Sequence, residues 1–84
     1  SAKYTLIVRG KSAHVGRNFH EGRNAIVGCA MWVMRLAMLN QDFPHCAINI
    51  GKIQGGEAVN QVPELAMAYL DVRAPSTEDL AAID

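Results

Sequence analysis

The sequence has no surplus of charge of either sign. Its eight basic and eight acidic side chains cancel, and only 19% of the 84 residues are charged. Aromatic residues are scarce at 6%, and Tyr4 and Tyr69 are the only ones suited to stack on a base from a predicted strand. Nucleic-acid-binding domains of this size usually carry a basic excess, and sheets that bind RNA need exposed aromatic side chains. The composition therefore predicts no nucleic-acid partner.

Cysteines and long apolar runs are also scarce. Cys29 and Cys46 are too few for a disulfide scaffold, and both lie in apolar segments, so we expect two small buried hydrophobic residues. No apolar run reaches the length of a membrane span, and no signal-peptide pattern opens the sequence. We expect no membrane partner and a cytoplasmic protein; a signal segment of a longer chain would precede Ser1.

Motifs that carry chemistry by themselves are missing from the sequence. There is no nucleophile with a base beside it, no glycine-rich phosphate loop and no histidine pair spaced for one helix face. The three histidines, His14, His20 and His45, are scattered along the chain. We therefore expect no metal site within this chain.

The remaining composition is that of one small globular domain. Half of the residues are apolar, and a chain of this length buries about 60–65% of the surface that it exposes when unfolded. Alternating β-branched and aromatic residues predict strands, and a proline-free apolar run predicts a helix. The expected elements are strands at Tyr4–Arg9, Cys46–Ile53 and Pro63–Arg73, a helix at Ala25–Leu39, and a short helix that begins at Ser76 with Asp79 in its first turn.

The elements follow one another in the order β-α-β-β-α. Helices on one face of a mostly antiparallel sheet form a two-layer α+β sandwich, and one further strand would complete the ferredoxin-like pattern. We therefore predict an α+β, two-layer sandwich of ferredoxin-like β-α-β-β-α(-β) topology, with the final strand missing from this chain.

The long helix has expected boundaries and an unusual surface. Asn24 is its expected N-cap, and Asn40 is expected to end it in the left-handed conformation. Arg35 is the only charged residue between Ala25 and Leu39, and apolar side chains spread around the whole circumference. A helix on a sheet needs only one apolar stripe, so this one needs a second cover.

We expect that cover to be the same helix of a second copy of the chain, across a two-fold axis. The alternative is that Met31, Met34 and Met38 fill a core within one chain.

Apolar packing does not explain a few polar residues, namely His14, Asn60, Asp71 and Arg73. His14 lies in a glycine-punctuated loop between the first strand and the helix, where it is either functional or simply solvated. Asn60 follows a Gly-Gly pair and precedes a proline; its amide either bonds a ligand or is an ordinary turn residue. Arg73 ends a strand, where its guanidinium either binds a carboxylate in bidentate fashion or pairs with Asp71.

Taken together, these residues resemble those of a known family. The motif residues are, in chain order, Gly10-x-x-x-His14-x-Gly16, Gly22-x-Asn24-Ala25-Ile26, Gly55-Gly56-x-x-x-Asn60-x-x-Pro63 and Asp71-x-Arg73. In this order they are similar to the dimerisation (lid) domain of the di-zinc aminoacylase, acetylornithine deacetylase, succinyl-diaminopimelate desuccinylase and glutamate carboxypeptidase family. The stretch from His14 to Ile26 looks most like the glutamate carboxypeptidase branch.

The resemblance implies roles for three residues. His14 would reach across a homodimer, formed through the helix and an edge strand, and donate a hydrogen bond to the scissile carbonyl oxygen of the other subunit's substrate as negative charge develops. Asn60 and Arg73 would help to hold that substrate, Arg73 by its terminal carboxylate.

The resemblance also implies a larger enzyme. Residues 1–84 would be a dimerisation domain excised from a two-domain zinc peptidase, whose separate catalytic domain holds two zinc ions. The whole enzyme would hydrolyse a peptide or N-acyl amino-acid amide bond, and this chain alone would be inactive. The alternative is a non-catalytic ferredoxin-like module that dimerises or binds a partner. It predicts that His14, Asn60 and Arg73 lie far apart or in private salt bridges.

Overall fold

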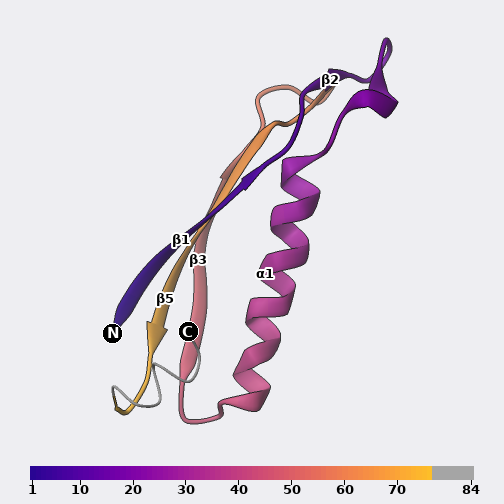
Figure 1. Cartoon of the computed structure of the whole chain (residues 1–84). Coiled ribbons are helices and arrows are strands. Elements are labelled where there is room, and N and C mark those ends of the chain that lie inside the picture. Colours follow the sequence, from indigo (N-terminus) through magenta and orange to yellow (C-terminus); the bar gives the residue numbers. More distant parts are fainter. Residues whose placement is uncertain (77–84) are drawn as a thin grey trace.

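The computed structural model describes residues 1–76 as one helix packed along an antiparallel sheet (Figure 1). The elements, in chain order, are β1 (Ala2–Arg9), β2 (Ala13–His14), the 3-10 turn η1 (Phe19–Glu21), α1 (Ala25–Asp42), β3 (Ala47–Gly55), β4 (Gln61–Val62) and β5 (Leu65–Arg73). The predicted two-layer α+β architecture is confirmed. The short helix expected from Ser76 onward lies outside the described residues.

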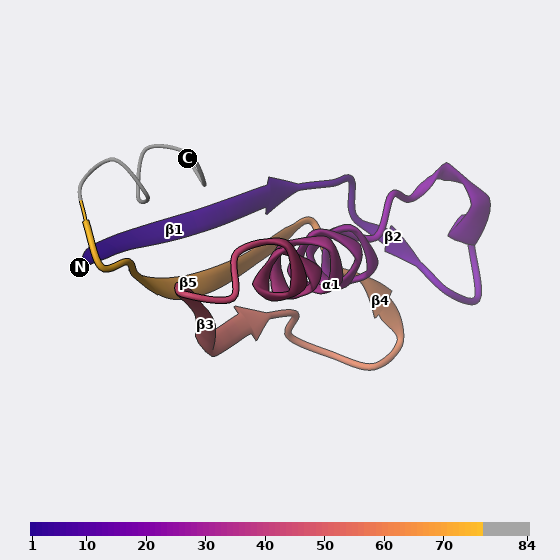
Figure 2. The same ribbon diagram turned by 90° about the horizontal axis from the view of Figure 1, so that it is seen from below.

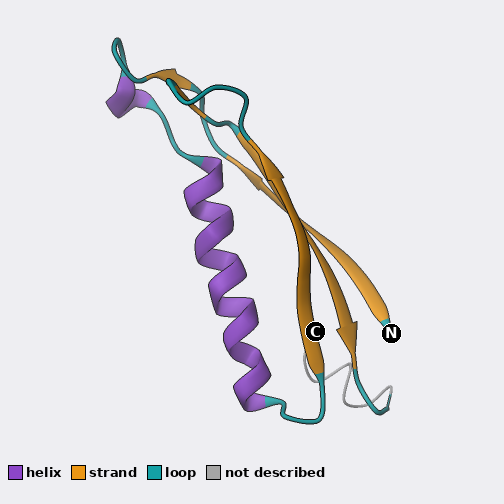
Figure 3. Cartoon of the chain, turned by 180° about the vertical axis from the view of Figure 1, so that it is seen from behind, coloured by secondary structure: helices purple, strands orange, loops and turns teal. Residues whose placement is uncertain are grey.

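The main sheet has three long strands in the order β1–β5–β3, and both pairings are antiparallel. Viewed from below, α1 covers one face of this sheet (Figure 2). The short strands β2 and β4 pair with each other in a second, two-stranded ribbon. This ribbon lies beyond the end of the sheet near the start of α1 (Figure 3), and the sequence pattern did not predict it.

The core lies between β5 and α1. Along β5 every second side chain is buried against the helix, as the alternation predicts: Ala66, Ala68, Leu70 and Val72. From the helix, Ala25 and Cys29 are each 1% exposed. The small residues let the helix lie close to the sheet, since even a methyl group on Gly28 would lie 3.1 Å from Val8 of β1. The core is thus thin and built largely from small side chains.

The two ends of α1 differ in how well the sequence predicts them. Asn24 is the N-cap, and its side-chain oxygen accepts a 3.0 Å hydrogen bond from the Val27 N–H. The expected stop at Asn40 is wrong, because the helix continues to Asp42. The Asn40 amide instead bonds both backbone groups of Ile48, accepting from its N–H at 2.8 Å and donating to its carbonyl at 3.0 Å. This side chain joins α1 to β3, which holds Asn40 in the helical conformation.

The cysteines and the Gly-Gly turn show two further outcomes. Cys29 is buried as predicted, but Cys46 is half-buried and precedes β3, in a turn where its N–H donates to the Phe43 carbonyl at 2.9 Å. The expected strand start at Cys46 is therefore wrong by one residue, because that turn uses its N–H. Gly56 has a φ of 83°, so the predicted turn requires the left-handed conformation that glycine adopts without steric cost.

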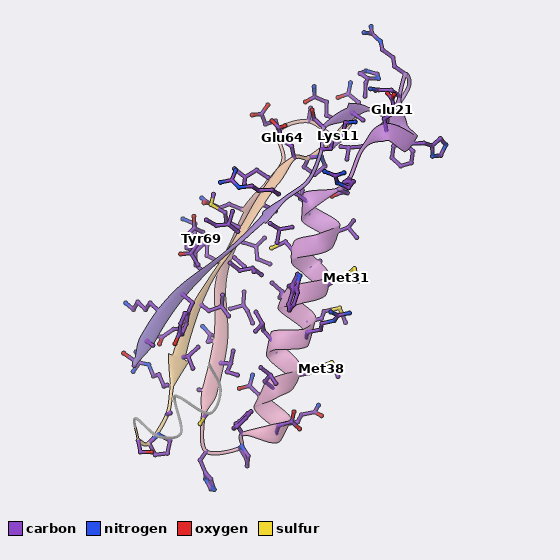
Figure 4. The ribbon with its side chains drawn as sticks, viewed as in Figure 1. Lys11, Glu21, Met31, Met38, Glu64 and Tyr69 are labelled. Atoms are coloured by element: carbon purple, nitrogen blue, oxygen red, sulfur yellow. The ribbon has the colours of Figure 1, made fainter. Side chains whose placement is uncertain are left out.

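The outer side of α1 is apolar and uncovered. Met31, Met34 and Met38 are 54%, 66% and 60% exposed, and Met31 and Met38 project away from the sheet (Figure 4). The alternative in which these methionines fill a core within one chain is therefore wrong. In the part of the chain that is described, no helix has the length and apolar character needed to span a membrane.

Candidate functional site

The candidate site lies at one end of the molecule, which we call the tip: residues 10–24 and 56–63, with the β2–β4 ribbon at its centre. The rest, β1, α1, β3 and β5, is the body. His14 is in β2, half-buried, and pairs with Gln61 of β4. The next residue, Val15, donates its N–H to the Asn60 carbonyl at 3.0 Å. The tip therefore brings the backbones of His14 and Asn60 close together from distant parts of the sequence.

Backbone hydrogen bonds hold the tip together and join it to the body. Lys11 and Arg23 exchange N–H to carbonyl bonds of 2.9 Å, and the Ala25 N–H donates to the Pro63 carbonyl at 2.9 Å. The Gly10 N–H donates to the Glu64 carbonyl at 2.9 Å. A side chain at Gly10 would collide with the Arg23 carbonyl oxygen. The close crossing of these segments therefore requires glycine at position 10.

The His14 ring is held by the turn that follows it. The Gly16 N–H donates to His14 Nδ1 at 3.0 Å, and the His14 N–H donates to Asn18 Oδ1 at 2.8 Å. The His14 carbonyl accepts from the N–H groups of Arg17 and Asn18 at 3.1 and 3.0 Å. Within residues 1–76, Nε2 of His14 and the side-chain amide of Asn60 have no hydrogen-bond partner. These two polar groups are therefore available to a ligand.

Arg73 does not join them. It is the last residue of β5 and pairs with Ala47 at the end of the sheet opposite the tip (Figure 1). The nine-residue β5 places Arg73 about 26 Å from its start next to the tip. There the Arg73 side chain is 69% exposed, and its guanidinium donates to one Asp71 oxygen through Nε at 3.3 Å and Nη2 at 3.2 Å. Within a single chain, Arg73 is therefore far from His14 and Asn60.

Asp71 has two unlike carboxylate oxygens. Oδ2 accepts both hydrogen bonds from Arg73, whereas Oδ1 is buried without a hydrogen-bond partner among residues 1–76. The ion pair that the sequence offered as an alternative for Arg73 is therefore present. It occupies one edge of the guanidinium and leaves the exposed remainder open to a second carboxylate.

A hollow of about 310 Å³ lies beside the tip, where β3 turns toward β4. Its lining includes the Gly55–Gly56 turn, Glu57 and Glu64, but not His14, Asn60 or Arg73. This hollow is therefore separate from the candidate side chains.

The described residues do not fit a metal site. Among residues 1–76, no three side chains of His, Cys, Asp or Glu are grouped so that they could hold an ion. No metal chemistry is therefore assigned to these residues.

Sequence reasoning assigned no role to the two residues that hold His14, although Gly16 was among the motif residues. Gly16 and Asn18 act through hydrogen bonds to a ring nitrogen and to a backbone N–H. The spacing His-x-Gly-x-Asn was visible, and Asn is known to bond nearby backbone groups in turns. That spacing is common in loops, however, and only the pairing of β2 with β4 shows how these residues are oriented in the fold.

Comparison with known proteins gives consistent matches. The family model described as the peptidase dimerisation domain matches residues 1–84. A homolog of one of the subunits of p-aminobenzoyl-glutamate hydrolase, from Haemophilus influenzae, is 34% identical over 74 residues, which cover 87% of this chain and 18% of that protein. An indole-3-acetyl-aspartic acid hydrolase from Enterobacter agglomerans is 31% identical over 84 residues, covering 95% of this chain and 18% of that protein.

The structural comparison agrees. The crystal structure of an aminobenzoyl-glutamate utilization protein from Klebsiella pneumoniae matches with a TM-score of 0.79 at 26% identity, over 96% of this chain and 21% of that one. The chain thus spans about a fifth of the length of the proteins that it matches. Since the family model covers all 84 residues, this chain belongs to the peptidase dimerisation domain family.

Proposed function

We propose that this chain is the lid and dimerisation domain of a larger zinc-dependent amidohydrolase or peptidase, and that its tip completes the active site of a second protomer. The observation that carries the proposal is that the tip, at one end of an otherwise structural domain, holds two polar groups without a hydrogen-bond partner among residues 1–76: Nε2 of the half-buried His14 and the amide of the exposed Asn60. Since neither group has a partner among residues 1–76, we propose that their ligand comes from another surface.

The outer face of α1 supports a homodimer. Val27, Met31, Met34 and Met38 follow one another at spacings of four, three and four residues and are 54–66% exposed. This is the spacing of the seam through which two helices pack side by side. Exposed apolar surface of this extent along one helix is typical of a protein interface.

The free edge of β3 extends the same surface. β3 has β5 as its only strand neighbour within residues 1–76, so its outer edge is open to pairing. Ile53 of β3 lies on the helix side of the sheet and is 51% exposed, and Ile26 of α1, near the Gly56 turn, is 39% exposed. We therefore assign the dimer interface to α1 and the β3 edge.

Such a dimer would bring the separated residues together. Antiparallel pairing of β3 with its copy, about an axis near the strand centre, places the end of one β3 beside the start of the other. Within each chain, Arg73 is the strand partner of Ala47 at the start of β3. In the dimer, Arg73 of the partner subunit would therefore lie two strands away, about 10 Å across the sheet, from the end of β3 that leads to Asn60. Each composite site would then combine one tip with the other protomer's Arg73.

Each residue has a separate task in this proposal. His14 donates a hydrogen bond to the scissile carbonyl oxygen as that oxygen gains negative charge, and Asn60 holds a polar group of the substrate. The partner's Arg73 binds the terminal carboxylate. The zinc ions, in a catalytic domain outside this chain, would activate the attacking water.

The names of the relatives suggest the substrate class. p-Aminobenzoyl-glutamate and indole-3-acetyl-aspartate are both amides between an aromatic acid and an acidic amino acid. We therefore propose an N-acyl amino acid with a free carboxylate as the substrate, as in the glutamate carboxypeptidase branch. A guanidinium that can bind a carboxylate suits this class.

The second candidate is a dimerisation module without a catalytic role. The Asp71–Arg73 ion pair favours it, because this pair already gives Arg73 a partner far from the tip. Under this reading, His14 and Arg73 would never contribute to one site, and replacing either would leave turnover unchanged.

Subunit complementation separates the two candidates. His14→Ala and Arg73→Ala are made in the intact enzyme, and the two inactive dimers are mixed under conditions that exchange protomers. If the sites are composite, each mixed dimer has one site with neither defect, so random exchange restores about a quarter of the wild-type activity. If both residues served the same protomer's site, every site would keep one defect and no activity would return. Full activity of each variant on its own would support the second candidate, the dimerisation module without a catalytic role.

A further inference from the structure

We infer that the turn after β2 fixes His14 in one tautomer, with the ring proton on Nε2, and that Gly16 and Asn18 are the positioning residues. The inference rests on the proposed function and deepens it by assigning the chemical form in which His14 acts. It also decides which roles the imidazole cannot have.

The first step concerns Nδ1. The Gly16 backbone N–H donates to this nitrogen at 3.0 Å. An amide N–H can only donate, so Nδ1 must present its lone pair and carry no proton. A neutral imidazole has one N–H, which is therefore on Nε2.

The second step concerns the rigidity of the turn. Asn18 bonds His14 on both sides: its Oδ1 accepts the His14 N–H at 2.8 Å, and its own N–H donates to the His14 carbonyl at 3.0 Å. The His14 backbone is also paired with Gln61 across the ribbon. The Gly16 N–H is thus held at a fixed position relative to the ring.

The third step concerns the size of residue 16. A Cβ at Gly16 would lie 3.3 Å from His14 Cε1 and 3.5 Å from Nδ1. The closer of these separations is tighter than an ordinary carbon contact. A side chain at this position would therefore push the ring away from the N–H that orients it.

The tautomer determines the chemistry. An Nε2–H points a donor at an oxygen that gains negative charge, whereas the other tautomer would point a lone pair at the same oxygen and repel it. With Nδ1 occupied and Nε2 protonated, His14 has no free lone pair. It therefore does not ligate a metal ion and does not take a proton from water.

The test is a nitrogen NMR measurement on the intact enzyme labelled with 15N-histidine. A long-range proton–nitrogen correlation distinguishes a protonated from an unprotonated ring nitrogen, and the His14→Gln variant identifies the His14 signals by their loss. The expected result is an unprotonated Nδ1 and a protonated Nε2 at a pH where the ring is neutral. A proton on Nδ1, or averaged signals from both tautomers, would overturn the inference.

Paired variants test the two positioning residues. Asn18→Ala removes the acceptor for the His14 N–H, and we expect tautomer averaging together with a roughly 10- to 100-fold lower kcat at little changed KM. Asn18→Asp keeps an acceptor oxygen and should restore both readouts. Gly16→Ala should shift the His14 signals as well. Arg17→Ala, a change in the same turn that keeps the backbone N–H, is the control and should leave the tautomer unchanged.

The outcomes separate this inference from the proposed function. If His14→Ala leaves turnover intact, the catalytic role fails whichever tautomer is present. If turnover falls but the spectrum shows Nδ1–H, the role stands and the tautomer assignment fails. If Asn18→Ala changes neither the spectrum nor kcat, Asn18 is not a positioning residue.

Discussion

The body and the tip of this domain are stabilised by different interactions. In the body, Leu70 and Val72 of β5 and Cys29 of α1 are almost completely buried. In the tip, Ala13 and Val62 are the buried hydrophobic residues, and backbone hydrogen bonds and glycine contacts provide the rest. Burial of apolar surface supplies stability without directional precision, whereas hydrogen bonds in a tight turn orient individual atoms. The comparison indicates that the body supplies most of the apolar burial and that the tip fixes the orientation of individual atoms.

The largest effect is expected from a cavity in the body. Leu70→Ala should lower the free energy of unfolding by about 2–5 kcal/mol, because a side chain only 7% exposed leaves a void between β5 and α1. Urea unfolding measures this change. The control is Ile7→Ala on the neighbouring strand, where the side chain is 50% exposed and the loss should stay within about 0.5 kcal/mol. Equal losses for both variants would contradict the assigned core.

The corresponding substitution in the tip should lower turnover and leave stability unchanged. His14→Ala in the intact enzyme should lower kcat about 100- to 1000-fold, the usual cost of removing one oxyanion-hole donor. The midpoint of thermal unfolding should not move, because the half-buried ring makes one hydrogen bond, to a backbone N–H in its own turn. If instead the midpoint of thermal unfolding shifted and kcat did not change, the assignment of separate roles to the tip and the body would be wrong.

A smaller effect is expected on the outer side of the body. Met34→Glu adds a charge in the middle of the exposed apolar stripe and should weaken the dimer by roughly 1.4–2.8 kcal/mol, a ten- to hundredfold rise in Kd. Sedimentation at several concentrations measures this Kd. Thr5→Glu adds the same charge on the open face of the sheet and should leave dimerisation unchanged. Equal dissociation constants for both variants would rule out α1 as the interface.

The smallest of these effects concerns the link between α1 and β3. Asn40→Ala removes the two hydrogen bonds to the backbone of Ile48 and should cost about 1–2 kcal/mol of stability. Gln41→Ala, next to it and exposed, is the control with an expected change near zero. Since the link is at the end of the body opposite the tip, kcat should remain at its wild-type value in both variants. A fall in kcat would show that the body positions the tip through this link.

Comparing the sequence patterns with the fold shows which features are local. The two-residue alternation of β5 and the Asn24 cap were predicted from the sequence and are present, because each depends on residues a few positions apart. The stop at Asn40 was wrong because a distant strand, β3, supplies partners for its amide. The ribbon was missed because two-residue strands carry no periodicity.

The sequence alone determined the α+β class, the faces of the long strand, and the choice of His14, Asn60 and Arg73 as candidates, since side-chain periodicity and residue chemistry are properties of short segments. Only the tertiary structure decided that His14 and Asn60 lie side by side, that Arg73 lies at the opposite end, and that the Gly16 N–H faces Nδ1. These features depend on pairing between distant segments, whose register and distances no local pattern contains.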